Sequence, residues 1–282
     1  MTIIESIILG IVQGLTEFLP ISSTGHLTLA GKLMNLISPD HPEQWTSFIA
    51  VIQLGTLLAV LVYFRNDLIS IIKDFIHDNL TNRVNYSDQK INSKLGWLII
   101  IGSIPVVIIG LLFKDAIEGT FTKNLYVIAT SLIVLALILG LAEKTAKFKK
   151  DLGNITILDS IIVGFAQALS LIPGSSRSGT TITAGLFVGM KREVAARFSF
   201  LLSIPAVLAS GLLQLVEALK FIDQTMTVNI IIATIVSGIS GYLAIDFLLK
   251  YLKRNSTFLF IYYRIALGFL ILILLLNNII QP

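Results

Sequence analysis

The sequence predicts an all-α, polytopic membrane protein with six transmembrane helices and two re-entrant helix-loop-helix elements, arranged as two inverted repeats. Three observations carry this prediction. The 282 residues are 55% hydrophobic and only 13% charged, with a mean hydropathy of +0.86, whereas soluble domains are about 25% charged. Six long apolar stretches follow one another along the chain, and a short motif occurs twice. A water-soluble globule is therefore excluded.

Each of the six apolar stretches has about the length needed to cross a membrane. A helix rises about 1.5 Å per residue, so roughly 20 residues cover about 30 Å of hydrocarbon. The expected spans are Phe48–Phe64, Leu95–Phe113, Leu125–Ala142, Phe198–Leu215, Val228–Leu249 and Phe258–Leu276. The chain has no Cys, which excludes disulfides and thiolate chemistry. Because no basic cluster is interleaved with aromatic residues, we expect no nucleic-acid partner.

A motif near the N-terminus is repeated in the second half of the chain. Residues 10–25 read GIVQGLTEFLPISSTG, and residues 164–179 read GFAQALSLIPGSSRSG. The glutamines of the two copies, Gln13 and Gln167, are 154 residues apart. Three spans follow each copy, so we expect two halves, residues 1–142 and 158–282, joined by a polar cytoplasmic linker at 143–157. Three spans between the copies would invert the second half, as in many transporters.

The segments around the second motif are too short to cross the membrane. Ser160–Ile172 has 13 residues and Thr180–Met190 has 11, on either side of a polar tip. We therefore expect each motif copy to form a re-entrant pair whose tip stops inside the membrane. Irregular backbone at that depth is tolerated only where protein or water surrounds it, which makes both tips candidate sites. The alternative is that Ile3–Leu19 is simply a first transmembrane helix.

The loop charges predict the orientation. Of the 21 Lys and Arg residues, 15 fall on the side that the chain reaches after the first span. Four fall on the other side, namely Lys32, Lys114, Lys123 and Lys220, and Arg177 and Arg264 lie inside apolar segments. By the positive-inside rule the side with 15 charges is cytoplasmic. Both termini and the mouth of the first re-entrant loop should then be extracytoplasmic.

The first tip carries a set of polar side chains stranded in apolar sequence. Burying such groups costs several kcal/mol of free energy unless they are hydrogen-bonded or hydrated, so they indicate a site. Gln13 and Glu17 are four residues apart and share a helix face. The tip also offers the hydroxyls of Ser22, Ser23 and Thr24 and the imidazole of His26. A carboxylate, an imidazole and hydroxyls are the groups that acid–base or nucleophilic chemistry needs. Taken alone, Glu17 could instead form a structural ion pair, and His26 could be a core histidine whose ring nitrogens are hydrogen-bonded.

The second tip is small, rich in hydroxyls and carries one arginine. Its candidate residues are Ser175, Ser176, Arg177, Ser178 and Thr181. The guanidinium of Arg177 stays charged and its fork suits phosphate, and helix N-termini at both tips would also favour an anion. The alternative is that Arg177 only neutralises Glu17. Gln53, inside the first span, is equally a packing residue or a site residue.

These motifs resemble those of a known family. Residues 13–26, QGLTEFLPISSTGH, are similar to the signature of bacterial undecaprenyl-diphosphate phosphatases, also called bacitracin resistance proteins, and residues 173–179, PGSSRSG, resemble that family's second motif. Many members have Glu where this chain has Gln13, which argues against a scheme with two essential carboxylates. The resemblance covers essentially the whole chain. It implies a multi-pass enzyme of the bacterial plasma (inner) membrane that hydrolyses undecaprenyl diphosphate, recycles the lipid carrier for cell-wall synthesis and confers bacitracin resistance.

The resemblance also implies roles for the tip residues. Ser23 or His26 would attack, Glu17 would accept or orient a proton, and Arg177 would stabilise the transferring phosphoryl group. A directly attacking water is a third alternative. Substrate contacts would come from Gln13, Ser22, Thr24, Gln53, Ser175, Ser176, Ser178 and Thr181.

The resemblance leaves the metal, the oligomeric state and one competing function open. No metal ligand set is evident, although Mg²⁺ or Ca²⁺ bridging the substrate phosphates is compatible with the family. The implied partners are a polyprenyl diphosphate and membrane lipid, with a homodimer as an open alternative. The competing function is an inverted-repeat transporter or flippase for a phosphorylated lipid or an anion.

Overall fold

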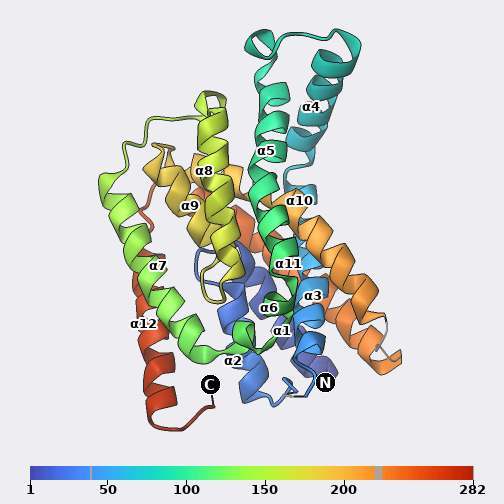
Figure 1. Cartoon of the computed structure of the whole chain (residues 1–282), viewed down its shortest axis with the longest axis vertical. Helices are drawn as coiled ribbons and strands as arrows, with labels where there is room; N and C mark the ends of the chain where they lie inside the picture. The colour runs from blue at the N-terminus through green and yellow to red at the C-terminus, as the bar shows by residue number, and fades with distance from the viewer. Residues whose placement is uncertain (39, 220–223, 282) are drawn as a thin grey trace.

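The computed structural model describes residues 1–38, 40–219 and 224–281, and within these ranges the protein is helical, with no strand (Figure 1). The α-helices are α1 Ile3–Phe18, α2 Ser23–Leu33, α3 Pro42–Tyr63, α4 Arg65–Ile76, α5 Ile91–Leu112, α6 Lys114–Glu118, α7 Leu125–Thr145, α8 Ile157–Ala168, α9 Arg177–Phe187, α10 Arg192–Ala218, α11 Gln224–Leu252 and α12 Phe258–Leu276. The prediction of an all-α fold is therefore confirmed for the described residues.

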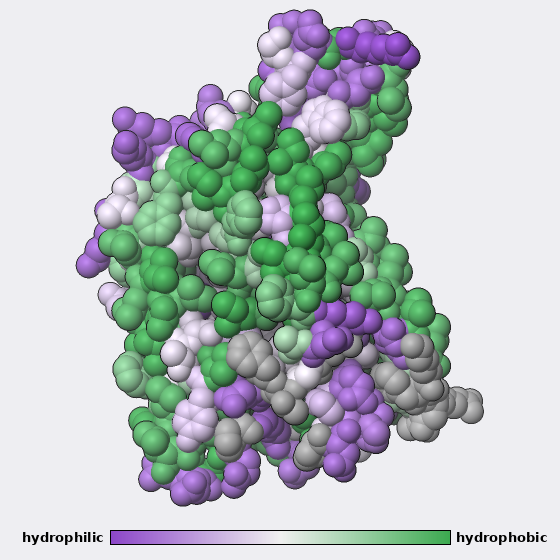
Figure 2. All heavy atoms as spheres, in the orientation of Figure 1, coloured by the Kyte–Doolittle hydropathy of each residue, from purple (hydrophilic) through white to green (hydrophobic). Residues whose placement is uncertain are grey.

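Six of these helices are long and apolar enough to cross a membrane: α3, α5, α7, α10, α11 and α12. Four of them contain a predicted span in full, and α3 and α5 end one residue before their predicted spans do; several begin earlier, as α3 does at Pro42 rather than at Phe48. Figure 2 shows hydrophobic side chains over the middle of the molecule and hydrophilic ones gathered at its two ends. The prediction of a multi-pass membrane protein is thus supported by both the helices and the surface.

Two pairs of short helices, α1–α2 and α8–α9, contain the repeated motif. They have 16, 11, 12 and 11 residues, so none reaches the roughly 20 residues that a span needs. Both pairs begin with the same capping box, Thr2 with Glu5 and Thr156 with Asp159. Both pairs thus have the short helices and the matching start that a repeated re-entrant pair would have. Their depth in the membrane and the division into two inverted halves stay predictions.

Helices of the two predicted halves pack mainly against each other. Helix α1 lies along α11, and the equivalent α8 lies along α5. The close approach of α1 and α11 depends on Gly10, because a Cβ at that position would lie 2.6 Å from the carbonyl oxygen of Ala233. The first helix of each short pair is therefore packed against a long helix of the other half.

Helix α7 extends into the first residues of the predicted linker at 143–157. Helix α7 continues to Thr145, because the buried carboxylate of Glu143 is held by two partners: it accepts a 2.9 Å hydrogen bond from Thr257 Oγ1 and pairs with Arg192. Residues 143–145 thus belong to the helix rather than to the linker.

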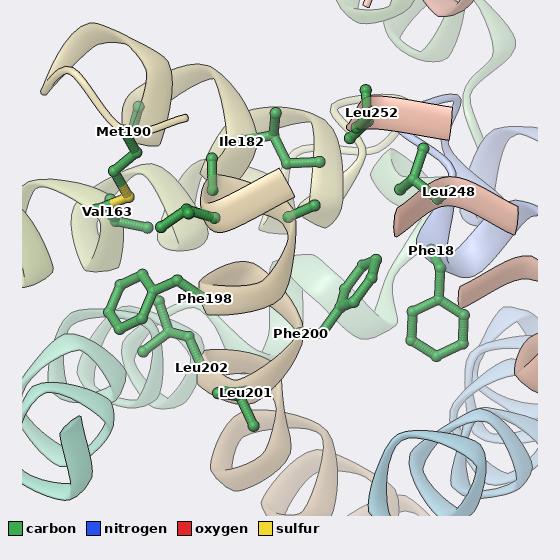
Figure 3. Close-up of a cluster of buried hydrophobic side chains, with 14 of the residues drawn as sticks. Phe18, Val163, Ile182, Met190, Phe198, Phe200, Leu201, Leu202, Leu248 and Leu252 are labelled. Atoms are coloured by element: carbon green, nitrogen blue, oxygen red, sulfur yellow. The ribbon is translucent and has the colours of Figure 1, made fainter. Parts of the chain in front are cut away.

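The hydrophobic core supports the end of α1 where the first tip begins. Figure 3 shows the side chains of Phe18 and of Phe200 of α10 in one buried cluster, with Leu248 of α11 near Phe18. The rings of Phe18 and Phe200 make an edge-on contact with centroids 5.1 Å apart, an arrangement that adds about 0.5–1.5 kcal/mol to burial. Since Phe18 follows Glu17 directly, this packing anchors the last turn of α1, from which Glu17 projects.

The two ends of the bundle differ in composition. The N- and C-termini lie at the same end, and α4 with the start of α5 projects beyond the bundle at the opposite end (Figure 1). The projecting end carries Arg65, Lys73, Arg83, Lys90 and Lys94. The end with the basic excess is therefore the one far from the termini.

Candidate active site

The first tip is a sharp turn between α1 and α2. Helix α1 ends before Pro20, and Leu19 has the extended backbone (φ −66°, ψ 139°) typical of a residue before proline. Ser22 has a φ of 75°, and its Oγ accepts a 3.2 Å hydrogen bond from the amide of Gly25, capping α2. This turn makes Ser23 the first residue of α2.

The second tip has the same backbone geometry, 154 residues later. Ser176 has a φ of 67°, and its Oγ accepts a 3.1 Å hydrogen bond from the amide of Gly179, capping α9. Arg177 is the first residue of α9, as Ser23 is of α2. The repeat therefore places a hydroxyl and a guanidinium at equivalent positions on two helix N-termini.

Both tips pack against one residue of α7. A Cβ on Gly174, whose φ is +86°, would collide with the carbonyl oxygen of Ile128, and a Cβ on Gly25 would lie 3.2 Å from Cγ2 of the same Ile128. Glycine is needed at position 174 for both reasons, since side chains rarely adopt that backbone conformation. Ile128 thus marks the point where the two tips meet.

The carboxylate of Glu17 is the centre of the site. It is 4% exposed and accepts four hydrogen bonds, two on each oxygen. Oε2 accepts from Ser23 Oγ at 2.7 Å and from Gln13 Nε2 at 3.0 Å. Oε1 accepts from Gln53 Nε2 at 2.7 Å and from Arg177 Nη2 at 2.9 Å. Because Ser23 donates its hydroxyl proton directly to a buried carboxylate, this pair has the geometry of a nucleophile with its base.

Arg177 is more than the counter-ion of Glu17. The ion pair exists, as one of our alternatives expected, but it uses only Nη2. The Nε and Nη1 groups of Arg177 are buried and have no hydrogen-bond partner among the described residues. A buried donor left unpaired costs about 1–3 kcal/mol. These two donors are therefore available to an anion in the site.

The site forms the polar floor of a cavity of about 510 Å³. Its floor contains Glu17, Ser23, Gln53, Ser176 and Arg177. One wall is apolar and comes from α5 and α10, with Val106, Val107, Leu111, Val207 and Leu213. The cavity reaches Thr46 near the start of α3 and Thr122 just before α7, at the end of the molecule that carries the termini. It can therefore hold a charged group against an apolar one.

Seven of the twelve predicted site residues line this cavity: Glu17, Ser22, Ser23, Thr24, Gln53, Ser176 and Arg177. Four others are buried behind it. Gln13 donates to Glu17, Ser178 Oγ donates to the carbonyl of Leu19 at 3.0 Å, and Thr181 Oγ1 donates to the carbonyl of Arg177 at 2.7 Å. The Oγ of Ser175 is buried without a partner among the described residues. These four are placed to support the floor rather than to face the cavity.

His26 lies on the first turn of α2, as predicted, and its side chain reaches toward α12. Its imidazole is not part of the cavity lining described above, and its ring nitrogens contact groups other than Ser23 and Glu17. Nδ1 lies 2.7 Å from the carbonyl oxygen of Ser22, and Nε2 lies 2.7 Å from the hydroxyl of Tyr263. The structure thus places the imidazole between Ser22 of the first tip and Tyr263 of α12, and a part of His26 in the chemistry stays a prediction.

Gln167 lies in the site, although it was not among the predicted site residues. Its side chain is fully buried and lines the cavity, and both its amide atoms lack a partner among the described residues. The repeat contained the signal, because Gln167 is the counterpart of Gln13. Leu171 stands where the first copy has Glu17, so Gln167 has no carboxylate to bind. Its donor and acceptor are left to a ligand or water.

The described residues hold no group of three His, Asp or Glu side chains that converge as metal ligands do. Both oxygens of Glu17 already accept two hydrogen bonds each. The donor set in the described part of the chain therefore does not fit a protein-bound Mg²⁺ or Ca²⁺, and we derive no step through such an ion.

The fold and the site together define a class: an integral membrane protein with a buried serine–carboxylate–guanidinium site and room for an amphipathic anion. The comparisons with known proteins specify the family. The family model described as "Bacitracin resistance protein BacA" matches residues 6–270, and the chain belongs to this family.

Relatives match along nearly the whole chain. An undecaprenyl-diphosphatase of Syntrophobacter fumaroxidans is 56% identical over 268 residues, covering 95% of both chains. The undecaprenyl-diphosphatase of Chloroherpeton thalassium is 50% identical, covering 98% of this chain and 97% of its own. That of Chlorobaculum parvum is 47% identical over the full length of both chains.

Proposed function

We propose that this protein is a membrane phosphatase that hydrolyses undecaprenyl diphosphate to undecaprenyl phosphate and inorganic phosphate, and so recycles the lipid carrier of cell-wall synthesis. The observation that carries the proposal is the 2.7 Å hydrogen bond from Ser23 Oγ to Glu17, on a carboxylate that also binds Arg177. The relatives named undecaprenyl-diphosphatase support the substrate, and the family's name supports a part in bacitracin resistance.

In the proposed reaction, Ser23 attacks the terminal phosphorus. A bond forms between Ser23 Oγ and phosphorus, the bond from phosphorus to the bridging oxygen breaks, and undecaprenyl phosphate leaves with the electron pair. The hydroxyl proton passes to Glu17 Oε2, the atom to which Ser23 already donates. Water then attacks phosphorus, the bond from phosphorus to Ser23 Oγ breaks, and the proton on Glu17 returns to Oγ. Inorganic phosphate leaves with the oxygen and both protons of the water.

Arg177 supplies the charge that the transferring group requires. Its unpartnered Nε and Nη1 point to a bidentate contact with phosphoryl oxygens. The N-termini of α2 and α9 begin at Ser23 and Arg177 and add partial positive charge at the same place. The apolar wall from α5 and α10 suits the first isoprene units of the lipid tail.

The competing function is transport of a phosphorylated lipid or an anion, and one measurement separates the two. We expect the purified protein in detergent micelles to release inorganic phosphate from a polyprenyl diphosphate, because hydrolysis needs no second compartment. A transporter without hydrolytic activity would release none. If the purified protein binds the lipid but releases no phosphate, the proposed function is wrong.

We also propose an orientation in the bacterial plasma membrane, with the cavity and both termini on the extracytoplasmic side. The cavity reaches the end of the bundle that carries the termini, and the basic excess lies at the other end (Figure 1); of the four basic residues assigned to the outer side, Lys220 lies outside the described residues. A reporter enzyme that works only in the cytoplasm, fused after residue 282, should be inactive. An active C-terminal fusion would reverse the orientation.

The remaining partners are proposals of the same kind. Membrane lipid is expected against the apolar surface in the middle of the molecule (Figure 2). The family resemblance adds two further candidates, a second copy of the chain and a divalent cation that bridges the substrate phosphates.

A further inference from the structure

Two consecutive residues of α12 contact the two tips separately. Tyr263 reaches the first tip through His26, and Arg264 reaches the second tip directly. Neither residue belongs to the cavity lining described above. The reacting groups of the site come from both tips, Ser23 from the first and Arg177 from the second, and a single helix contacts both tips.

At the first tip, Tyr263 fixes the ring of His26. The two rings are stacked, with centroids 5.6 Å apart and an interplanar angle of 6°. The carbonyl oxygen of Ser22 can only accept, so the 2.7 Å contact puts a proton on Nδ1 of His26. In the neutral imidazole Nε2 is then an acceptor, and the Tyr263 hydroxyl donates to it at 2.7 Å. The chain of two hydrogen bonds ends on Ser22, the residue with φ 75° whose turn orients Ser23.

At the second tip, Arg264 holds the equivalent turn. Its side chain is fully buried, and Nη2 donates to the carbonyl of Ser175 at 3.0 Å. A Cβ on Gly179 would lie 2.6 Å from Arg264 Nη1, so the guanidinium lies against the first turn of α9. Ser175 precedes Ser176, the residue with φ 67° whose turn orients Arg177.

We propose that α12 acts as a brace for catalysis, in which Tyr263 and Arg264 are positioning residues that hold the Ser22 and Ser175 carbonyls and thereby fix Ser23 and Arg177 relative to each other. In this arrangement His26 is the link between the brace and the first tip, and it neither attacks phosphorus nor transfers a proton during the reaction. The inference rests on the proposed function, because its readout is turnover. It predicts a loss of kcat at nearly unchanged KM, since the brace touches no substrate.

The first test uses a matched pair of neighbouring tyrosines. Tyr263→Phe removes only the hydroxyl and should lower kcat about three- to tenfold, the effect of one lost hydrogen bond, with KM changed less than about twofold. Tyr262 is 66% exposed and stacks on Phe258, so Tyr262→Phe should leave kcat and KM unchanged. Full kcat for Tyr263→Phe, or an effect on KM alone, would overturn the brace.

The second test separates a linking role of His26 from a chemical one. An asparagine places an amide nitrogen close to where histidine has Nδ1, so His26→Asn can still donate to the Ser22 carbonyl, although it cannot attack phosphorus or act as a base near neutral pH. We expect His26→Asn to keep kcat within about tenfold of wild type and His26→Ala to lose about a hundredfold or more. If both variants are equally inactive while their thermal unfolding midpoints match the wild type, His26 takes part in the chemistry and the proposal is wrong.

The wild-type protein in the same assay distinguishes this failure from failure of the proposed function. A wild-type protein that releases no phosphate contradicts the phosphatase assignment. An active wild type with an unaffected Tyr263→Phe variant contradicts only the brace.

Discussion

Replacing Ser23 by alanine should abolish turnover while leaving lipid binding nearly intact. The substitution removes the oxygen that donates to Glu17 at 2.7 Å, but it leaves Glu17 and Arg177 paired. We expect kcat to fall by a factor on the order of 10³ or more, and the affinity for a polyprenyl diphosphate to change by less than about tenfold, or 1.4 kcal/mol. Phosphate release and equilibrium binding in detergent measure the two quantities.

Ser210→Ala is the matched control. Ser210 lines the same cavity, but within the described part of the chain its hydroxyl donates to the Val207 carbonyl of its own helix and not to Glu17 or Arg177. Its kcat should stay within about twofold of wild type, as is usual for a serine outside the reacting groups. Substantial turnover by Ser23→Ala would remove Ser23 from the role of nucleophile.

Replacing Arg177 by lysine should cost about 3 kcal/mol of transition-state stabilisation, or about a hundredfold in rate. Lysine keeps the charge and can pair with Glu17, but it lacks the planar fork whose Nε and Nη1 are unpartnered in this site. The loss should therefore appear mainly in kcat, because the phosphoryl group gains charge as it transfers.

The control for this substitution is Arg197→Lys. Arg197 forms an ion pair with Asp67, and both side chains are more than a third exposed, 39% and 37%. Exposed pairs contribute little, so activity should not change. Near-wild-type turnover by Arg177→Lys would mean that the unpartnered donors do not contact the transferring group.

Local sequence patterns predicted much of the fold and part of the site. Apolar length alone identified the six long helices, because a span must hide its backbone from hydrocarbon over a fixed distance. The spacing of four between Gln13 and Glu17 predicted a shared helix face, and the 3.0 Å contact between them confirms it. The repeat predicted equivalent tips, and Ser22 and Ser176 share the same positive φ.

Contacts between distant segments could not be predicted from the sequence. His26 and Tyr263 are 237 residues apart, and nothing local in either segment indicates that α12 lies beside α2. The same limit applies to Gln53, whose bond to Glu17 depends on how α3 is rotated. Gln167 could be recognised only by comparing the two copies of the motif. Its amide has no partner among the described residues, because Leu171 stands where the first copy has the carboxylate of Glu17.

A rapid-quench experiment tests the central claim, that Ser23 attacks phosphorus with Glu17 as its proton acceptor. The purified protein is mixed with a polyprenyl diphosphate labelled at the terminal phosphorus and stopped within one turnover. We predict labelled phosphoserine at position 23, formed at least as fast as turnover and missing from Ser23→Ala. Labelled phosphohistidine at position 26 forming at the turnover rate would contradict the account, and so would turnover without any labelled protein, which would indicate direct attack by water.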